Sequence, residues 1–363
     1  MGCMTGTSLD GLDCALVETA GRGLSMRATF LRGHSMDLGA LKPRLRAIAD
    51  QVPITAGEVA GVMRDFAVLH ADAVRNLLAG GACDLVCVHG QTVYHKPPLS
   101  WQLFQPAPLV HALRVPVVYD LRQADLALGG QGAPITPLAD WVFFGEQIAP
   151  ATIVNLGGFC NITTYPDWHL REDHGLSHED RVRLIQARDV CACNQLLDAV
   201  ARVHLARPFD VDGAAAMRGM LREDIFSRLV SILTSQVAEG RSLGTGDELT
   251  RLVASLSAPR PEDIARSACE AIAEVVCGRS GVVHAAILAG GGTRNRALVR
   301  AFQQRAAHVR LSDDFGLPVE FREAACFAVL GALCQDRVPI TLPQVTKLPA
   351  GVAAPLSGVW AFP

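Results

Sequence analysis

The sequence has few aromatic residues, no long apolar run and no surplus of charge of either sign. Aromatic residues make up 6% of its 363 residues, and 33 Lys and Arg against 36 Asp and Glu give a formal net charge of −3. No apolar run approaches the roughly 20 residues that span a bilayer, and no basic cluster with interleaved aromatics indicates a nucleic-acid surface. The first residues also lack the charged-then-apolar plan of a signal peptide. We therefore expect a cytoplasmic protein without a membrane or nucleic-acid partner.

Three fingerprints of nucleotide binding are also missing. The sequence contains no G-x-x-x-x-G-K-[ST] loop, no well-placed G-x-G-x-x-G and no H-R-D set, which argues against the P-loop, Rossmann and protein-kinase classes. A phosphate-handling enzyme without a P-loop lysine must position phosphates with backbone amides, hydroxyls and a metal ion. Any phosphate site in this chain is expected to be of that kind.

The eleven cysteines lack the spacing of a disulfide framework. Most lie in apolar segments, so we expect reduced thiols that serve as small hydrophobic side chains. Cys191 and Cys193 invite a metal or redox interpretation, but a second pair and the C-x-x-C spacing are both missing. His174 and His178 have the helical spacing of metal ligands, yet they lie in a polar stretch without an obvious third ligand, which favours a solvated face.

The sequence does contain alternating apolar strands and amphipathic helices, which indicate an α/β protein. Its length is sufficient for two lobes, each with its own core. The stretch Leu128–Pro134, with three glycines and a proline, is the first strong break. We therefore expect an N-terminal lobe of residues 1–130 plus about 340–363, and a C-terminal lobe of residues 131–339.

Hydrophobic periodicity predicts the individual elements. Thr55 is a good cap for the longest early helix. Strands are expected at residues 1–4, 14–17, 25–32, 83–88, 115–119, 151–156, 162–165, 182–185 and 282–289. Helices are expected at residues 38–52, 56–79, 108–113, 194–205, 214–234, 245–255, 261–277, from 296 to about 306, and 322–335. The polar stretch 166–180 is expected to be an exposed loop.

Three glycine-rich loops each follow an apolar strand. The first contains two hydroxyls and two carboxylates among Gly6, Thr7, Ser8, Leu9, Asp10, Gly11, Leu12 and Asp13. The second lies in 155–161 and contains Gly157 and Gly158, and the third contains Gly290, Gly291, Gly292 and Asn295. Three such junctions favour convergence on one nucleotide, with Asp10 holding a magnesium ion against the phosphates. The alternative is three ordinary turns.

Asp189 is the best candidate for a general base. It follows the expected strand at 182–185 and precedes Asn194, which opens a helix, so its carboxylate could point into a cleft between lobes; the alternative is a helix cap. Arg122 could clamp a substrate carboxylate and Asp125 could bind sugar hydroxyls, or the two could form a surface ion pair. His89 and Gln91 could hold sugar hydroxyls, or be satisfied interior residues.

Six motifs occur in the order found in one known family. They are 6–13, His89-Gly90-Gln91-Thr92-Val93-Tyr94-His95, 129–134, 155–161, 290–295 and Glu323-Ala324-Ala325-Cys326-Phe327-Ala328. The chain thereby resembles the anhydro-N-acetylmuramic acid kinases over essentially its whole length.

This resemblance implies a two-lobed, actin-like sugar-kinase fold in which each lobe contains a ribonuclease-H-like mixed sheet with flanking helices, and ATP lies in the cleft between them. The family opens 1,6-anhydro-N-acetylmuramic acid with water and transfers the γ-phosphoryl group of ATP to O6, which gives N-acetylmuramic acid 6-phosphate and ADP. The family serves recycling of cell-wall sugars, and its members are usually homodimers. ATP and Mg²⁺ are the cofactors that the resemblance implies.

The resemblance also assigns roles to residues of this chain. Asp189 matches the family's catalytic base, the loop 6–13 and the pair Gly157-Gly158 would face the phosphates and Mg²⁺, and 290–295 would lie near the nucleoside. The residues expected to bind the sugar are His89, Gln91, Arg122, Gly132, Asn194 and Glu323.

One departure from the family pattern follows the expected base. Where many members have Asp-Thr-Gly-Pro-Gly-Asn, this chain has Asp189-Val190-Cys191-Ala192-Cys193-Asn194, so both glycines and the proline are replaced. This change makes a kinase of another anhydrosugar, such as levoglucosan, an alternative hypothesis. A non-catalytic nucleotide-binding sensor is a third, although the intact set Asp10, Asp189 and Glu323 argues against it.

Overall fold

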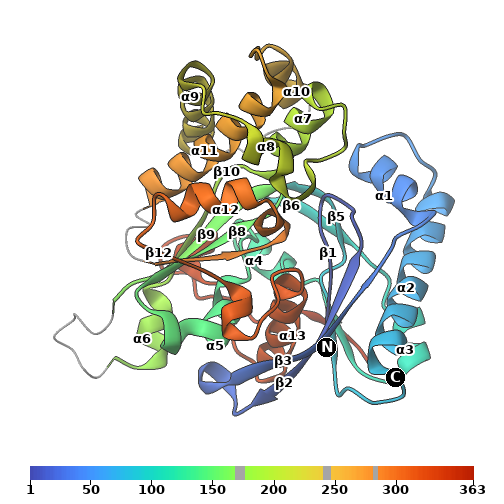
Figure 1. Cartoon of the computed structure of the whole chain (residues 1–363). Coiled ribbons are helices and arrows are strands. Elements are labelled where there is room, and N and C mark those ends of the chain that lie inside the picture. The colour runs from blue at the N-terminus through green and yellow to red at the C-terminus, as the bar shows by residue number, and fades with distance from the viewer. Residues whose placement is uncertain (168–175, 240–246, 281–284) are drawn as a thin grey trace. The chain divides into compact units, whose positions relative to one another are not determined.

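The computed structural model describes residues 1–167, 176–239, 247–280 and 285–363 (Figure 1). The chain forms two compact units. The first contains Met1–Gln147, the described residues of 171–185 and Gly316–Pro363, and the second contains the described residues of 148–170 and 186–315. The sequence led us to expect residues 131–339 in the second lobe, but 131–147, the described residues of 171–185 and 316–339 belong to the first unit.

The first unit is built on a six-stranded mixed sheet in the order β13-β7-β4-β1-β2-β3. Its strands are β1 (Gly2–Thr5), β2 (Leu12–Ala20), β3 (Arg27–Met36), β4 (Val86–Val88), β7 (Val117–Tyr119) and β13 (Val359–Ala361). Strands β1, β2 and β3 are antiparallel, with Cys3 opposite Cys14, whereas β4 and β7 continue the sheet in parallel. The predicted N-terminal hairpin is confirmed.

Helices cover both faces of this sheet. Apolar residues of α1 (Leu41–Ala49), α2 (Ala56–Leu78) and α3 (Ala107–Leu113) form one core with Cys3, Cys14 and Val88. Helix α2 begins at a capping box between Thr55 and Glu58. The opposite face is covered by α13 (Arg322–Gln335), so close to β1 that a Cβ atom at Gly2 would lie 1.9 Å from the carbonyl oxygen of Ala324.

The first unit also contains a small hairpin and several short helices. The hairpin pairs β5 (Gln91–Lys96) with β6 (Leu99–Leu103). The remaining helices are η1 (Gly23–Ser25), α4 (Gln123–Ala127), α5 (Pro137–Ile148), α6 (His178–Arg183) and α14 (Pro343–Thr346).

The second unit repeats the strand order of the first. Its sheet runs β10-β9-β8-β11-β12, formed by β8 (Ala151–Leu156), β9 (Phe159–Tyr165), β10 (Gln186–Ala192), β11 (Ala285–Ala289) and β12 (His308–Leu311). The first three strands are antiparallel and the last two are parallel to β8. Its helices are α7 (Asn194–His204), α8 (Ala214–Arg218), α9 (Glu223–Glu239), α10 (Asp247–Ala254), α11 (Pro261–Ser280) and α12 (Arg296–Gln303), with η2 (Val211–Gly213), η3 (Gly291–Arg294) and η4 (Ser312–Phe315). The expected mixed sheet with flanking helices is therefore present in each unit.

Several elements differ from the sequence expectation. The strand predicted at 182–185 is wrong, because Val182 lies in α6, whose first turn is capped by the Ser177 side chain. The helix predicted at 214–234 is interrupted at Gly219, where a Cβ atom would meet the carbonyl oxygen of Glu262 at 2.0 Å. Much of the stretch 166–180, including His174, lies outside the described residues.

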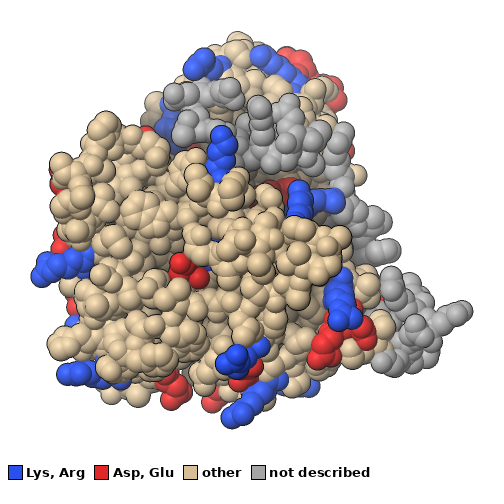
Figure 2. Space-filling view, turned by 180° about the vertical axis from the view of Figure 1, so that it is seen from behind, with Lys and Arg blue, Asp and Glu red and all other residues tan. Residues whose placement is uncertain are grey.

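The state of the cysteines and the distribution of surface charge agree with what the composition led us to expect. All eleven cysteines are free thiols, and most are buried. Among the described residues, none of the helices combines the length and apolarity needed to span a bilayer. Figure 2 shows basic and acidic side chains scattered over the face drawn there, rather than gathered into a patch of one sign.

Candidate active site

The loop between β1 and β2 exposes polar side chains above buried leucines. Thr7, Ser8 and Asp10 are exposed, whereas Leu9 and Leu12 are fully buried in the core of the first unit. The Leu9 amide donates to the carbonyl of Gly6 at 3.1 Å, and Leu9 has a positive φ of 59°, which is uncommon for a residue with a side chain. Only the backbone of the two leucines is therefore available to a ligand.

Other contacts hold this loop in place. Arg46 of α1 donates to the carbonyl of Ser8 at 3.0 Å, and the Asp13 carboxylate accepts a hydrogen bond from the Ser35 hydroxyl. Asp13 thus ties β2 to β3, which leaves Asp10 as the loop carboxylate directed at solvent. A fixed loop with exposed hydroxyls can receive phosphate oxygens without first being ordered.

Asp10 has the chemistry that a magnesium ion requires. Its side chain is 81% exposed, and its nearest cation, Lys42, lies 4.0 Å away. Magnesium keeps several waters and is commonly held by one or two carboxylates together with substrate phosphates. The described residues contain no group of three or more His, Cys, Asp or Glu that could hold a metal alone. Asp10 therefore fits a magnesium ion shared with a phosphate ligand.

Arg122 joins two of the predicted sugar-binding residues. Its Nη1 group donates to the carbonyl of Gly132 at 2.9 Å, and its Nη2 group lies 3.0 Å from Nε2 of His89. Burial, and then the positive charge of Arg122, hold the pKa of His89 well below its usual value. The imidazole is therefore neutral and its Nε2 accepts the hydrogen bond. Gln91 is fully buried two residues further on.

Asp125 organises the turn rather than facing a ligand. It is fully buried, and its carboxylate accepts hydrogen bonds from the Gly132 amide and the Thr346 hydroxyl, both at 2.8 Å. A Cβ atom at Gly130 would lie 2.1 Å from this carboxylate. The expectation that Asp125 forms a surface ion pair with Arg122 is therefore wrong, and the glycines are needed where the turn wraps around it.

Glu323 lies in the first turn of α13, beside a buried ion pair that the sequence analysis missed. Arg322 donates through Nε to Asp140 Oδ1 at 2.9 Å and through Nη2 to Oδ2, and both side chains are almost completely buried. Burial raises the pKa of Asp140, although the nearby Arg322 opposes this shift. The pair fixes the start of α13, and thereby the backbone that carries Glu323. Because 182 residues separate the partners, no local pattern could have revealed it.

The second unit contains a compact glycine turn. Gly157 and Gly158 connect β8 to β9, and their carbonyls accept hydrogen bonds from the amides of Cys193, Asn194 and Gln195 at 2.9–3.2 Å. These amides belong to the first turn of α7, where unpaired N–H groups are normally found. The Asn194 side chain donates to the carbonyl of Leu156 at 3.0 Å. Asn194 therefore holds the helix against the end of β8.

The third glycine loop packs against the same strand end. A Cβ atom at Gly290, where φ is +83°, would lie 2.7 Å from Oδ1 of Asn155, and one at Gly292 would lie 2.9 Å from Oδ1 of Asn194. The parallel strands β8 and β11 end side by side, so two of the three predicted loops do meet. Asn295 has a structural task, because its Oδ1 accepts the Leu298 amide and caps α12.

Asp189 lies within a strand, not after one. It is in β10, opposite Asn161 of β9, and a bulge separates Asp189 from Cys191 in the pairing. Its side chain is exposed, whereas Val190, Cys191, Ala192 and Cys193 are buried. Bulges commonly re-aim a side chain beside an active site. The alternative of a helix cap is wrong, since Cys193 occupies the cap position of α7.

The unusual sequence after Asp189 has a structural explanation. Strand β10 continues to Ala192, which is possible because the residues there are apolar and include neither glycine nor proline. Burial raises the pKa of Cys191 to about 12, so this thiol stays protonated and behaves as a hydrophobic side chain. A metal or redox role for Cys191 and Cys193 receives no support from this environment.

Comparisons with known proteins identify the family. The family model described as "Anhydro-N-acetylmuramic acid kinase" matches residues 1–353. Proteins of that name from Synechococcus sp. (strain WH7803) and Bordetella pertussis are 32% and 33% identical, over 95% of this chain and 95% and 92% of their own lengths. A solved ROK family glucokinase from Streptomyces griseus aligns over 91% of this chain and 98% of its own, at 13% identity and a TM-score of 0.39. The chain belongs to the anhydro-N-acetylmuramic acid kinase family.

Proposed function

We propose that this protein is an ATP- and Mg²⁺-dependent kinase that opens 1,6-anhydro-N-acetylmuramic acid with water and phosphorylates O6. The observation that carries the proposal is the family match across residues 1–353, which includes an exposed Asp189 at a strand bulge. A carboxylate in this position can accept a proton from water. Asn194 remains at the same place as in the family pattern.

The nucleotide would be held mainly by backbone groups and hydroxyls. In the first unit, Thr7, Ser8 and the amides of 6–13 would contact phosphate oxygens, and Asp10 would hold Mg²⁺. In the second unit, Gly157, Gly158 and Gly291 lack side chains, which would permit close approach of a phosphate or nucleoside. Bound Mg²⁺ would supply charge neutralisation at the phosphates.

The sugar would be held by the predicted set around Arg122. The Arg122 guanidinium carries donors suited to the carboxylate of a muramic acid. Neutral His89 accepts a hydrogen bond from Arg122 and would orient that guanidinium. The fully buried Gln91 donates to the Thr92 carbonyl and would support the strand rather than contact the sugar. Glu323, at the start of α13, would accept a hydrogen bond from a sugar hydroxyl or amide, and the buried pair of Asp140 and Arg322 keeps its helix in position.

In the proposed reaction, Asp189 accepts a proton from water as the water oxygen bonds to C1. The C1–O6 bond of the anhydro bridge breaks, and its electron pair stays on O6. O6 then bonds to the γ-phosphorus of ATP as the bond to the β-phosphate oxygen breaks and ADP leaves. The proton taken by Asp189 is released to solvent after product formation.

One experiment tests this reaction directly. The full chain is incubated with ATP, Mg²⁺ and the anhydrosugar in H₂¹⁸O, and the product is analysed by mass spectrometry. We expect a product heavier than the anhydrosugar by one phosphoryl group and one water, with the label on C1. A phosphorylated product without added water would indicate an ordinary hydroxyl kinase and would refute the proposal.

We also propose a cytoplasmic homodimer that acts in recycling of cell-wall sugars, as the resemblance to the family implies. Light scattering after size-exclusion chromatography should give twice the mass of one chain. A mass of 38.7 kDa at all protein concentrations would contradict the dimer but not the reaction.

A further inference from the structure

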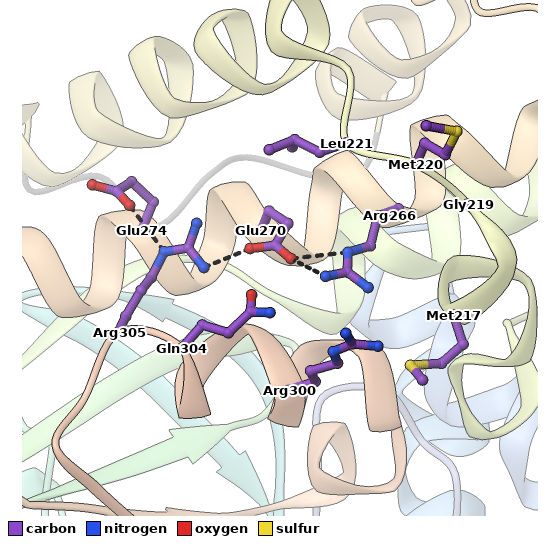
Figure 3. Close-up of a pocket in the computed structure, with 10 residues that line it drawn as sticks. All are labelled: Met217, Gly219, Met220, Leu221, Arg266, Glu270, Glu274, Arg300, Gln304 and Arg305. Carbon is purple, nitrogen blue, oxygen red and sulfur yellow. Dashed lines mark hydrogen bonds and ion pairs between the residues drawn. The ribbon is translucent and has the colours of Figure 1, made fainter.

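A polar cavity lies in the second unit, outside the glycine loops. It occupies about 640 Å³ between α11, α12 and the segment 217–221 (Figure 3). This volume is within the usual range for sites that bind small molecules. Its lining residues include three arginines and two glutamates, so its formal charge is +1.

One wall of the cavity is a fixed network of charged side chains. Glu270 is only 4% exposed, and its Oε1 accepts hydrogen bonds from Nε and Nη2 of Arg266 while its Oε2 accepts from Nη1 of Arg305. Arg305 also donates through Nε to Glu274 at 2.9 Å. A buried carboxylate between two arginines holds both guanidinium groups in one orientation, as a ligand site requires.

The facing wall supplies a cation with no ion-pair partner among the described residues. Figure 3 shows the guanidinium of Arg300 pointing from α12 toward the side of Arg266 that faces away from Glu270. Gln304, one turn further along the chain, directs its amide into the same space. Two guanidinium groups directed at a shared space repel each other unless an anion lies between them.

The cavity also has an apolar edge. Met217, Met220 and Leu221 line it, and their exposed fractions are 39%, 68% and 46%. The segment is held in place because Asp263 accepts the Met220 amide at 2.9 Å. Exposed methionines beside charged groups suit a ligand that has a polar head and a less polar body.

We propose that this cavity binds a small organic phosphate, with Arg266, Arg300 and Gln304 contacting the phosphate oxygens and Met217, Met220 and Leu221 covering the organic part. A phosphate presents three acceptor oxygens in different directions, which matches donors that come from two helices, whereas a carboxylate presents two oxygens in one plane. The site is separate from the residues assigned to the kinase reaction, so it stands or falls independently of that proposal.

Arg300 lies on the helix that follows the third glycine loop, 290–295, so the cavity is connected to that loop through α12. Helix α12 begins directly after 290–295, where Asn295 caps it, and Arg300 lies about one and a half turns further on. A ligand that draws α11 and α12 together would therefore act on the helix that follows the third glycine loop.

The test measures binding to the full chain by isothermal titration calorimetry, with inorganic phosphate, glucose 6-phosphate and acetate at equal ionic strength. Arg300→Gln is the test variant, because Arg300 is exposed and its loss should leave folding intact. Arg251→Gln on α10, an exposed arginine outside the cavity, is the matched control. The unfolding temperature of each variant without ligand is measured first.

We expect glucose 6-phosphate to bind more tightly than inorganic phosphate, and acetate to bind much more weakly than either. Arg300→Gln should weaken glucose 6-phosphate binding at least tenfold, while Arg251→Gln leaves it unchanged. Equal phosphate affinity in Arg300→Gln and the unmodified chain would place binding elsewhere and overturn the proposal. Absence of binding by all three anions would overturn it as well.

Discussion

The two units share a strand order, but the loops that connect their first two strands differ in what they expose. In the first unit, β1 and β2 are joined by a loop that exposes Thr7, Ser8 and Asp10. In the second unit, β8 and β9 are joined by Gly157 and Gly158, whose carbonyls accept hydrogen bonds from backbone amides at the start of α7. One fold can thus present exposed polar side chains at one hairpin and, at its counterpart, a glycine backbone that is hydrogen-bonded to a helix.

The largest effect is expected from Asp189, the proposed base in the second unit. Asp189→Asn should lower kcat by about 10³-fold because the amide cannot accept the proton from water. The side chain is exposed, so the free energy of unfolding should change little. Steady-state kinetics and chemical denaturation measure both quantities, with the exposed Asp313→Asn as a control. Turnover close to that of the unmodified enzyme would rule out Asp189 as the base.

The next largest effect concerns the buried charges of the first unit. Asp140→Asn leaves the Arg322 guanidinium buried without its carboxylate, which should lower the free energy of unfolding by about 3 kcal/mol. The double variant Asp140→Leu with Arg322→Met should recover much of this loss, because it removes both charges. Urea denaturation compares the two, and a double variant less stable than the single one would contradict this account.

Matched glycine substitutions compare the first hairpin loop with the third glycine loop, which packs against the end of β8 in the second unit. Gly290→Ala places a Cβ atom against Asn155 at a φ of +83° and should cost about 2 kcal/mol of stability. At Gly6 the nearest atom to a new Cβ is the Ser8 hydroxyl at 3.5 Å, so Gly6→Ala should cost under about 0.5 kcal/mol. Thermal and urea unfolding measure both, and equal costs would show that the two loops are not differently constrained.

A smaller effect is expected for the exposed carboxylate of the first loop. Asp10→Asn should raise the Mg²⁺ concentration needed for half-maximal activity by about tenfold. Because Asp10 is 81% exposed and 4.0 Å from Lys42, stability should change by less than about 0.5 kcal/mol. A magnesium titration at fixed ATP provides the measurement. An unchanged requirement would assign the metal to other groups.

The smallest effect is a pH dependence localised to the first unit. Burial lowers the pKa of His70 to about 4 from its usual 6.5. Between these pH values the unfolded chain binds the proton and the folded chain does not, so the free energy of unfolding falls as the pH drops from 6.5 toward 4. His70→Gln should weaken this dependence. Urea unfolding at pH 7.5 and 5.0 tests it, and an identical pH dependence in the variant would exclude His70 as a contributor.

The elements that could be predicted from the sequence are those fixed by neighbouring residues. The Thr55 capping box and the apolar face of α2 are local signals, and so is the antiparallel hairpin around the first glycine loop. The hairpin β5–β6 was missed because its strands are only five or six residues long and adjoin Pro97 and Pro98. The strand predicted over 182–185 failed because capping by Ser177 outweighed its apolar composition.

The sequence predicted which types of residue belong to the candidate site, but not which of them contact one another. Glycines after strands indicated where a ligand could approach, and Gly290 and Gly292 do pack against the end of β8. Nothing in the local sequence indicates that Arg122 joins His89 to Gly132, or that Asp125 is buried beneath the turn. Such contacts depend on tertiary packing between distant segments, which periodicity does not describe.

The packing of α13 on β1 also has a consequence for synthesis of the protein. On the ribosome, β1 is made first, but the helix that covers Gly2 is translated only after the whole second unit. One face of the first unit's sheet therefore stays uncovered until α13 has been translated. The helices that cover β8–β12 are mostly encoded between those strands. Domains generally fold as units during translation. The second unit is thus able to complete its core first, although it is encoded in the middle of the chain.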